Sequence, residues 1–150
     1  MLLAEALQNR ADLQKRIEQL NDRIEANVLV QEGETPPENP EKLICEAEEC
    51  YRRLEALMVR MNNANAATRT AEGTLTELIA RRECLIKRTE TYRRFLEEAR
   101  SCTRRATRTE IKILSVIDVG AYQAKCDQYA KEARRLDTLI QATNWTTELR

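Results

Sequence analysis

The chain has 150 residues, enough for one domain with a modest core, and its 25 basic and 25 acidic side chains give a formal net charge of zero. Charged residues make up 33% of the sequence and aromatic residues only 4%, which favours long helices with narrow buried seams over a thick globular core. Histidine is absent from the sequence, which excludes Ser–His and Cys–His nucleophiles, imidazole metal ligands and the Glu-x-x-His sites of diiron bundles.

The cysteine pattern and the first residues of the chain predict where the protein is found in the cell. The five cysteines are Cys45, Cys50, Cys84, Cys102 and Cys126, with no C-x-x-C spacing among them. An odd number of scattered thiols predicts reduced cysteines in a cytoplasmic protein, without a metal site or a cofactor. Glu5 interrupts the apolar start, and no apolar run reaches the length of a membrane span, so we expect neither a secretion signal nor a membrane anchor.

Two helices are predicted in the first half of the chain, over residues 2–30 and 40–66. Apolar residues recur in both at alternating steps of three and four positions, as in a coiled coil. They are Leu13, Ile17, Leu20 and Ile24 in the first helix, and Leu43, Ala47, Cys50, Leu54, Leu57, Met61 and Ala64 in the second. Asn39 is expected to cap the second helix, with Pro40 in its first turn, and the short connection makes the two helices antiparallel neighbours.

The second half predicts two further helices with a short extended segment between them. Thr74 and Glu77 have the spacing of a capping box at the start of the third helix, residues 75–101. Residues 109–117 contain five Ile, Leu or Val residues, which favours an extended segment. Asp118 then caps the fourth helix, residues 119–141.

These elements predict an all-α fold: one domain, residues 1–150, built as a long antiparallel helical hairpin or coiled-coil bundle of four helices with one short extended segment. A lone strand cannot satisfy its own backbone N–H and C=O groups. We therefore expect the segment to pair with a second copy of the chain, giving a homodimer or a higher closed oligomer.

The charge is unevenly spread along the chain. Residues 1–66 carry 8 basic and 13 acidic side chains, a net charge of −5, whereas residues 67–108 carry 11 and 6, a net charge of +5. An acidic helix pair beside a basic helix explains this distribution. The alternative is a polyanion-binding face, with nearby Tyr92 and Phe95 as the only stacking partners. Its candidate residues are Arg100, Arg104, Arg105, Arg108 and Lys112.

A second candidate site lies in the amide-rich stretch 61–70. Side chains of this kind compete for backbone hydrogen bonds and commonly end a helix. The alternative is a small polar pocket for a small ligand, formed by Asn62, Asn63, Asn65 and Thr68. The acidic residues elsewhere stand at helical spacing from arginines, which is typical of solvated faces, and we predict no catalytic residues.

Five stretches of the chain, at residues 2–7, 10–17, 31–34, 73–78 and 144–145, carry a family resemblance. On them the chain resembles the septicolysin-like family. The resemblance implies a small helical bacterial protein without an established biochemical role, and it carries no functional residue with it.

The leading functional interpretation is a cytoplasmic, non-enzymatic, self-associating coiled-coil protein that serves as a scaffold or interaction module. The alternative is an RNA-binding or polyanion-binding protein that uses the basic face of residues 75–101 and the arginines that follow. Membrane lysis is disfavoured, because the chain offers no apolar segment for insertion and no cysteine in an activating context.

Overall fold

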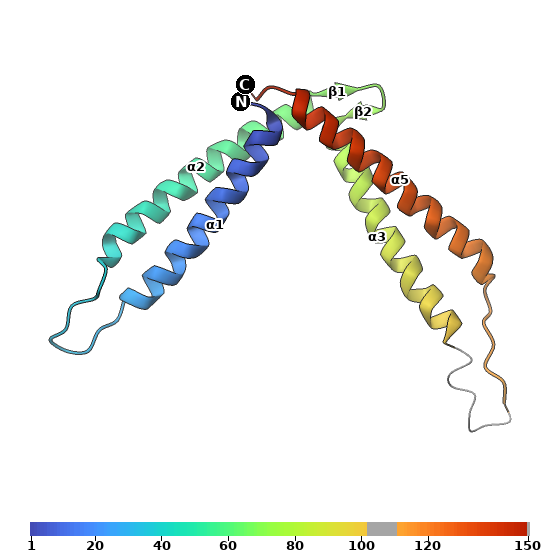
Figure 1. Cartoon of the computed structure of the whole chain (residues 1–150), viewed down its shortest axis with the longest axis horizontal. Helices are drawn as coiled ribbons and strands as arrows, with labels where there is room; N and C mark the ends of the chain where they lie inside the picture. Colours follow the sequence, from blue (N-terminus) through green and yellow to red (C-terminus); the bar gives the residue numbers. More distant parts are fainter. Residues whose placement is uncertain (102–110, 150) are drawn as a thin grey trace. The chain divides into compact units, whose positions relative to one another are not determined.

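The computed structural model describes residues 1–101 and 111–149, and the fold class is all-α as predicted. Within these residues the helices are α1 (Leu3–Asn27), α2 (Pro40–Ala67), α3 (Leu75–Arg100) and α5 (Val119–Thr146), shown in Figure 1. Two short antiparallel strands, β1 (Arg69–Thr70) and β2 (Gly73–Thr74), join α2 to α3.

The chain divides into two compact units. Unit 1 contains Met1–Thr68 and Thr143–Arg150, and unit 2 contains Arg69–Ala142. Each unit is built on one helical hairpin, α1 with α2 and α3 with α5. The two units are groups of residues in close mutual contact. The single domain over residues 1–150 stays a prediction.

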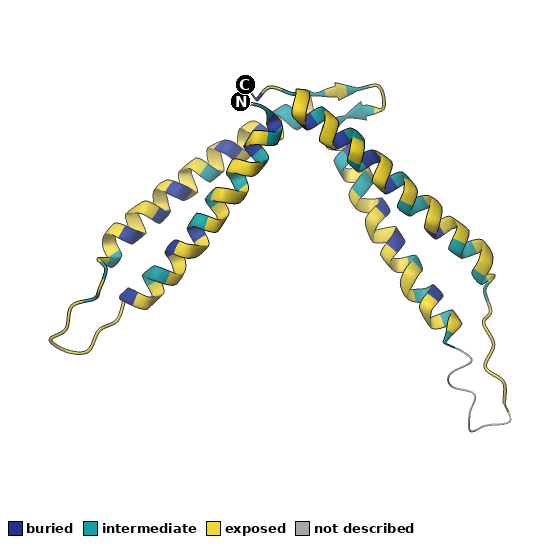
Figure 2. Cartoon of the chain, in the orientation of Figure 1, coloured by how far each residue is buried: buried dark blue, intermediate teal, exposed yellow. Residues whose placement is uncertain are grey.

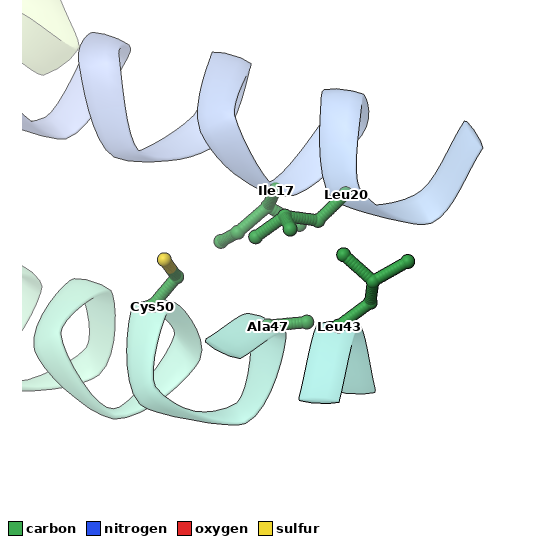
Figure 3. Packing of buried hydrophobic residues seen from close by; sticks show 5 residues of the cluster. All are labelled: Ile17, Leu20, Leu43, Ala47 and Cys50. Atoms are coloured by element: carbon green, nitrogen blue, oxygen red, sulfur yellow. The ribbon is translucent and has the colours of Figure 1, made fainter. Parts of the chain in front are cut away.

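The core of unit 1 is the seam between α1 and α2. Ile17 and Leu20 of α1 are buried against Leu43, Ala47 and Cys50 of α2, as Figure 3 shows. All five belong to the predicted apolar repeat, which confirms the antiparallel pairing. Figure 2 shows that buried residues follow a stripe along each helix while most of the remaining surface is exposed.

The seam of unit 2 contains two polar positions, each of which makes a hydrogen bond. Arg82 donates to Asp137 of α5 at 2.7 Å, and the buried Thr89 hydroxyl donates to the carbonyl oxygen of Leu85 at 2.8 Å. These two residues interrupt the apolar repeat Leu75, Leu78, Leu85, Tyr92, Leu96 and Ala99 of α3. The Thr89 hydroxyl is fully satisfied in this way, whereas Arg82 is held by its ion pair with Asp137.

The predicted helix starts are confirmed. The Asn39 side chain accepts from the backbone N–H groups of Glu41 and Lys42, and the Asp118 carboxylate accepts from the N–H of Ala121. Thr74 and Glu77 form the reciprocal capping box. These side chains satisfy N–H groups that have no partner inside the helix.

Two helix ends differ from the prediction. Helix α1 ends at Asn27 rather than at residue 30, because the Asn27 side chain is buried and accepts a hydrogen bond from the backbone N–H of Glu38. Helix α5 continues to Thr146 rather than to residue 141, and Asn144 in this added turn is buried.

The predicted extended segment 109–117 and the strands of the structure lie at different places. Residues 109 and 110 fall outside the described residues, and residues 111–118 form neither a helix nor a paired strand. The described strands are β1 and β2, which pair Arg69 with Thr74 and Thr70 with Gly73. The sequence analysis treated residues 61–70 as a helix end and missed this pair.

The two helical hairpins are internal repeats. Helices α2 and α5 have 28 residues each, and α1 and α3 have 25 and 26. Aligning the helix starts places identical residues at eight positions of α1 and α3. These pairs are Leu3 and Leu75, Glu5 and Glu77, Arg10 and Arg82, Leu13 and Leu85, Lys15 and Lys87, Arg16 and Arg88, Glu18 and Glu90, and Glu25 and Glu97. In the described chain the Nε atoms of both Arg10 and Arg82 are buried without a hydrogen-bond partner.

The strand pairs follow the same repeat. Thr74, which precedes α3, pairs with Arg69 after α2, and Leu2, which precedes α1, forms an isolated bridge with Glu148 after α5. The backbone N–H of Leu149 donates to the carbonyl of Met1 at 2.8 Å, so residues near the two ends of the chain lie together. In the repeat, the residues around Leu2 and Glu148 are therefore equivalent to strands β2 and β1, respectively.

This equivalence predicts that the chain tolerates circular permutation. Joining residue 150 to residue 1 through two glycines, and opening the chain between Ala71 and Glu72, should keep the helical content. The free energy of unfolding should change by less than about 1 kcal/mol. The glycine linker turns the bridge between Leu2 and Glu148 into a hairpin, while the turn between β1 and β2 is opened. Circular dichroism and urea unfolding measure both quantities. A control opened inside α2, between Glu55 and Ala56, should lose the fold, and a permutant opened at residue 71 that behaves like this control contradicts the repeat.

The thiols provide a second prediction. Cys50 and Cys126 are 6% and 2% exposed, whereas Cys45 and Cys84 are exposed, and all four are unpaired. Cys102 lies outside the described residues. In the folded protein a thiol reagent should modify Cys45 and Cys84 rapidly, and Cys50 and Cys126 only after unfolding, because the reagent must reach the sulfur. Peptide mapping after a timed reaction checks the order, with the variant C45S/C84S as control. Equal modification rates for buried and exposed thiols would count against the seam.

Candidate functional site

An apolar recess of about 580 Å³ lies in unit 2 where α3 ends and residues 111–118 lead into α5. Phe95 and Ala99 of α3 and Tyr122 of α5 form its helical walls. The other wall comes from the connecting segment. The residues of that wall are Ile113, Leu114, Ser115, Val116 and Ile117, and Glu98 and Ser101 complete the lining. We call this site the apolar recess.

The corresponding place in unit 1 is closed by polar side chains. Arg23 forms a bidentate ion pair with Glu38, with a distance of 3.0 Å between Nε and Oε2. The Asn27 amide donates to the carbonyl of Arg23 at 2.8 Å and accepts from the N–H of Glu38 at 2.9 Å. We call these three residues the polar closure. They link the last turn of α1 to the residue before the cap of α2.

The apolar recess arises where the second repeat replaces the polar closure. The repeat alignment places Phe95, Ala99 and Ile117 at the positions of Arg23, Asn27 and Glu38, respectively. All three replacements are uncharged, and all three line the recess. The two repeats therefore differ at the end of the hairpin, where the first is closed by hydrogen bonds and the second is open and apolar.

An aromatic cluster adjoins the recess. The ring of Tyr92 lies 4.8 Å from that of Phe95 and 5.3 Å from that of Tyr129, and Phe95 meets the edge of Tyr122 at 5.7 Å. A hydrogen bond with Tyr129 raises the pKa of the Tyr92 hydroxyl. In the first repeat aliphatic or small residues occupy the positions of the three tyrosines, so the second repeat has a wider seam here. Those residues are Leu20, Leu43 and Cys50.

The repeat also replaces an ion pair by two cations. In unit 1 Arg16 of α1 donates to Glu46 of α2 at 3.0 Å. The equivalent residues of unit 2 are Arg88 and Lys125, which carry the same sign. Arg88 lies over the ring of Tyr129 at 4.9 Å and Lys125 over that of Tyr122 at 5.2 Å. In unit 2 the aromatic rings thus contact the cations as the carboxylate of Glu46 does in unit 1. The rings carry no charge, so the positive charges of Arg88 and Lys125 are not neutralised by them.

A second depression, which we call the basic recess, adjoins the apolar one. Its volume is about 700 Å³, and it shares Glu98 and Ser101 with the apolar recess. It is otherwise lined by Arg93, Arg94, Glu97, Arg100 and Gln123. Arg100 donates to Gln123 at 2.6 Å, whereas Arg93 and Arg94 form no ion pair or hydrogen bond within the described chain. An apolar surface and two free guanidinium groups therefore lie next to each other.

The connecting segment beside the recess is unusually apolar for an exposed stretch. Val116 is 98% exposed and Leu114 is 74% exposed, and Ile111 and Ile113 are exposed as well. Within the described chain, Lys112, Ile113, Leu114 and Val116 make no hydrogen bond. Adjacent exposed aliphatic residues with free backbone groups are characteristic of surfaces that bind another chain.

The sequence-predicted site residues are only partly brought together. Of the candidate polyanion-binding residues, Arg104, Arg105 and Arg108 lie outside the described residues, Arg100 lines the basic recess, and Lys112 is exposed on the connecting segment.

The predicted polar pocket is also divided. Asn63 and Thr68 line a recess of about 430 Å³ in unit 1 together with Arg60 and Glu148, whereas Asn62 and Asn65 do not line it.

Sequence reasoning missed the apolar recess as a site, although it identified residues 109–117 as unusual. The signal that would have found the recess is the internal repeat, because aligning the repeats shows that polar residues are exchanged for apolar ones at matched positions. In residues 1–101 and 111–149 no acidic or cysteine side chains cluster as a metal site would require. None of the helices described is long and apolar enough to cross a membrane.

Comparisons with known proteins place the chain in a family. Residues 10–149 match a family of unknown function, DUF6847. The chain belongs to this family. It is also similar to a crystal structure of a functionally unknown conserved protein from Corynebacterium diphtheriae, with 37% sequence identity and a TM-score of 0.94. The similarity covers 100% of this chain and 99% of that one. No curated protein matches the chain.

The polar closure predicts a pH dependence. The ion pair with Arg23 lowers the pKa of Glu38 below its ordinary value of 4.5. The closure therefore stabilises the fold above that value, and its contribution is lost as the pH falls through the lowered pKa. In urea unfolding at pH 7 and pH 3, E38Q should lose less stability on acidification than the unmodified protein does. E34Q is the matched control in the same loop and should behave like the unmodified protein. If E38Q loses as much as the unmodified protein, Glu38 has no such role.

Proposed function

We propose that the protein is a non-enzymatic, self-associating interaction module whose association surface is the apolar recess of unit 2 with the connecting segment beside it. The observation that carries the proposal is the exchange between repeats. The same hairpin end is sealed by three polar residues in unit 1 and opened by three apolar residues in unit 2. Such an exchange gives the second repeat a surface that can bury apolar area against another chain.

The energetics of the surface favour a protein partner. Leu114 and Val116 are largely exposed in the single chain, and burying one such side chain contributes about 1.5–3 kcal/mol. The backbone groups of Lys112, Ile113, Leu114 and Val116, which make no hydrogen bond within the described chain, add donors and acceptors that a second polypeptide can satisfy. A second copy of the chain is the partner that is always present at the same concentration.

The chemistry of the side chains favours binding over catalysis. The sequence has no histidine, and Glu46, Glu49 and Glu132 bind arginine in ion pairs on the exposed surface. The four described cysteines are unpaired, which fits a reducing compartment such as the cytoplasm. The septicolysin-like resemblance adds no activity to this proposal.

RNA or polyanion binding is the alternative, and the basic recess is the feature that favours it. Arg93, Arg94 and Arg100 line this recess, but Glu97 and Glu98 line it too, so the positive charge is partly compensated. The aromatic rings nearby pack on one another rather than forming an open stacking platform. The mixed charge and packed rings make self-association the better-supported reading.

The sharpest test transfers the polar closure from unit 1 to unit 2. The variant F95R/A99N/I117E should fill the recess with the hydrogen-bonded set that the first repeat already uses. Light scattering coupled to size exclusion should then show a multimeric mass for the unmodified protein and a monomeric mass for the variant, because the apolar surface is lost.

Two further variants keep the test independent of folding. L114D/V116D changes only exposed residues and should also give a monomer, with unchanged circular dichroism. I44K/Y51K, on the exposed face of α2, is the matched control and should retain the multimer. A monomeric unmodified protein refutes self-association. Salt-dependent RNA binding that is lost in R104Q/R105Q/R108Q would establish the alternative.

A further inference from the structure

We propose that the occupant of the apolar recess is residues 28–34 of a second copy of the chain, with Val28, Leu29 and Val30 in the apolar recess and Glu32 and Glu34 against the arginines of the basic recess. This inference rests on the proposed function and specifies the partner segment. It makes the contact heterologous, with a different surface contributed by each copy.

The first support is the exposure of the segment. Leu29 is 86% exposed, and Val28 and Val30 are exposed as well, directly after the last turn of α1. The polar closure holds the segment outside the seam of unit 1, because Asn27 and Arg23 bind Glu38 across the end of the hairpin. Three consecutive aliphatic side chains are thus left without a core to enter.

The second support is the order of apolar and acidic residues along the segment. The three aliphatic residues are followed within four positions by Glu32 and Glu34, and residues 28–39 contain no basic side chain. The two recesses of unit 2 adjoin through Glu98 and Ser101, with apolar lining in one and arginines in the other. Four residues of extended chain span about 13 Å, so one short segment can reach from one recess into the next.

The third support is electrostatic. Arg93 and Arg94 form no ion pair with the described residues, and Lys112 on the connecting segment is also unpaired. An acidic segment brings carboxylates to these cations. Pairing of the connecting segment with its own copy would instead bring Lys112 and the arginines of two chains together, and like charges repel.

The inference is tested by complementation between two variants. V28S/L29S removes the aliphatic residues of the segment and keeps the recess, whereas F95R/A99N/I117E closes the recess and keeps the segment. Each variant alone should be monomeric in sedimentation velocity. An equimolar mixture, with one variant fluorescently labelled, should form a heterodimer, because one intact segment then meets one intact recess.

A charge exchange tests the acidic half of the contact. E32K/E34K and R93E/R94E should each weaken association by about tenfold or more, and combining all four substitutions in one chain should restore it. As a control on nearby charge, E48K/E49K on α2 should leave association unchanged.

The outcomes separate the two proposals. If V28S/L29S still associates while F95R/A99N/I117E does not, the recess is an association surface but the segment is not its occupant. Two monomeric variants that do not combine on mixing also overturn the segment as occupant, because an intact segment and an intact recess would then have failed to bind each other. A monomeric unmodified protein, including one that carries a bound amphiphile in native mass spectrometry, overturns both proposals.

Discussion

The seam between two antiparallel helices is the constraint on which the rest of the structure depends. A two-helix hairpin has no third element to cover it, so apolar residues can be buried only along one line of alternating three- and four-residue steps. Ile17 and Leu20 of α1 meet Leu43, Ala47 and Cys50 of α2 on that line. Residues off the line are mostly exposed, which explains the abundance of charged residues and the small number of aromatic ones.

The end of such a hairpin is its weak point, because the seam stops there and water reaches its last residues. The first repeat solves this with Arg23, Asn27 and Glu38, whose hydrogen bonds join the two helices beyond the last apolar contact. The second repeat has the same seam length but Phe95, Ala99 and Ile117 at these places. Its end is held instead by aromatic packing around Tyr92, which leaves apolar surface in contact with water.

Much of the fold was predictable from the sequence because the signals were local. Alternating apolar steps identified the helices, and Asn39, Thr74, Glu77 and Asp118 placed three of their starts by capping chemistry. The end of α1 was not predictable in the same way, since Asn27 stops the helix through a partner eleven residues away. The β1–β2 pair was missed because two-residue strands leave no alternating pattern to detect. The recess was missed because it becomes evident only when matched positions of the two repeats are compared. Neither the polar residues of the first repeat nor the apolar residues of the second form a recognisable motif alone.

The internal repeat also shows that a helical hairpin of this kind can close its end with polar side chains. If closing this end disrupted the helices, the apolar recess would be a by-product of the fold. In unit 1 the corresponding end is closed by Arg23, Asn27 and Glu38, and Asn39 caps α2 where Asp118 caps α5. The two ends differ in these three side chains and also in the connection, which has 12 residues in unit 1 (28–39) and 18 in unit 2 (101–118). Exposed aliphatic residues favour aggregation and add nothing to the stability of a single chain, which is the physical basis for proposing a partner that covers this end.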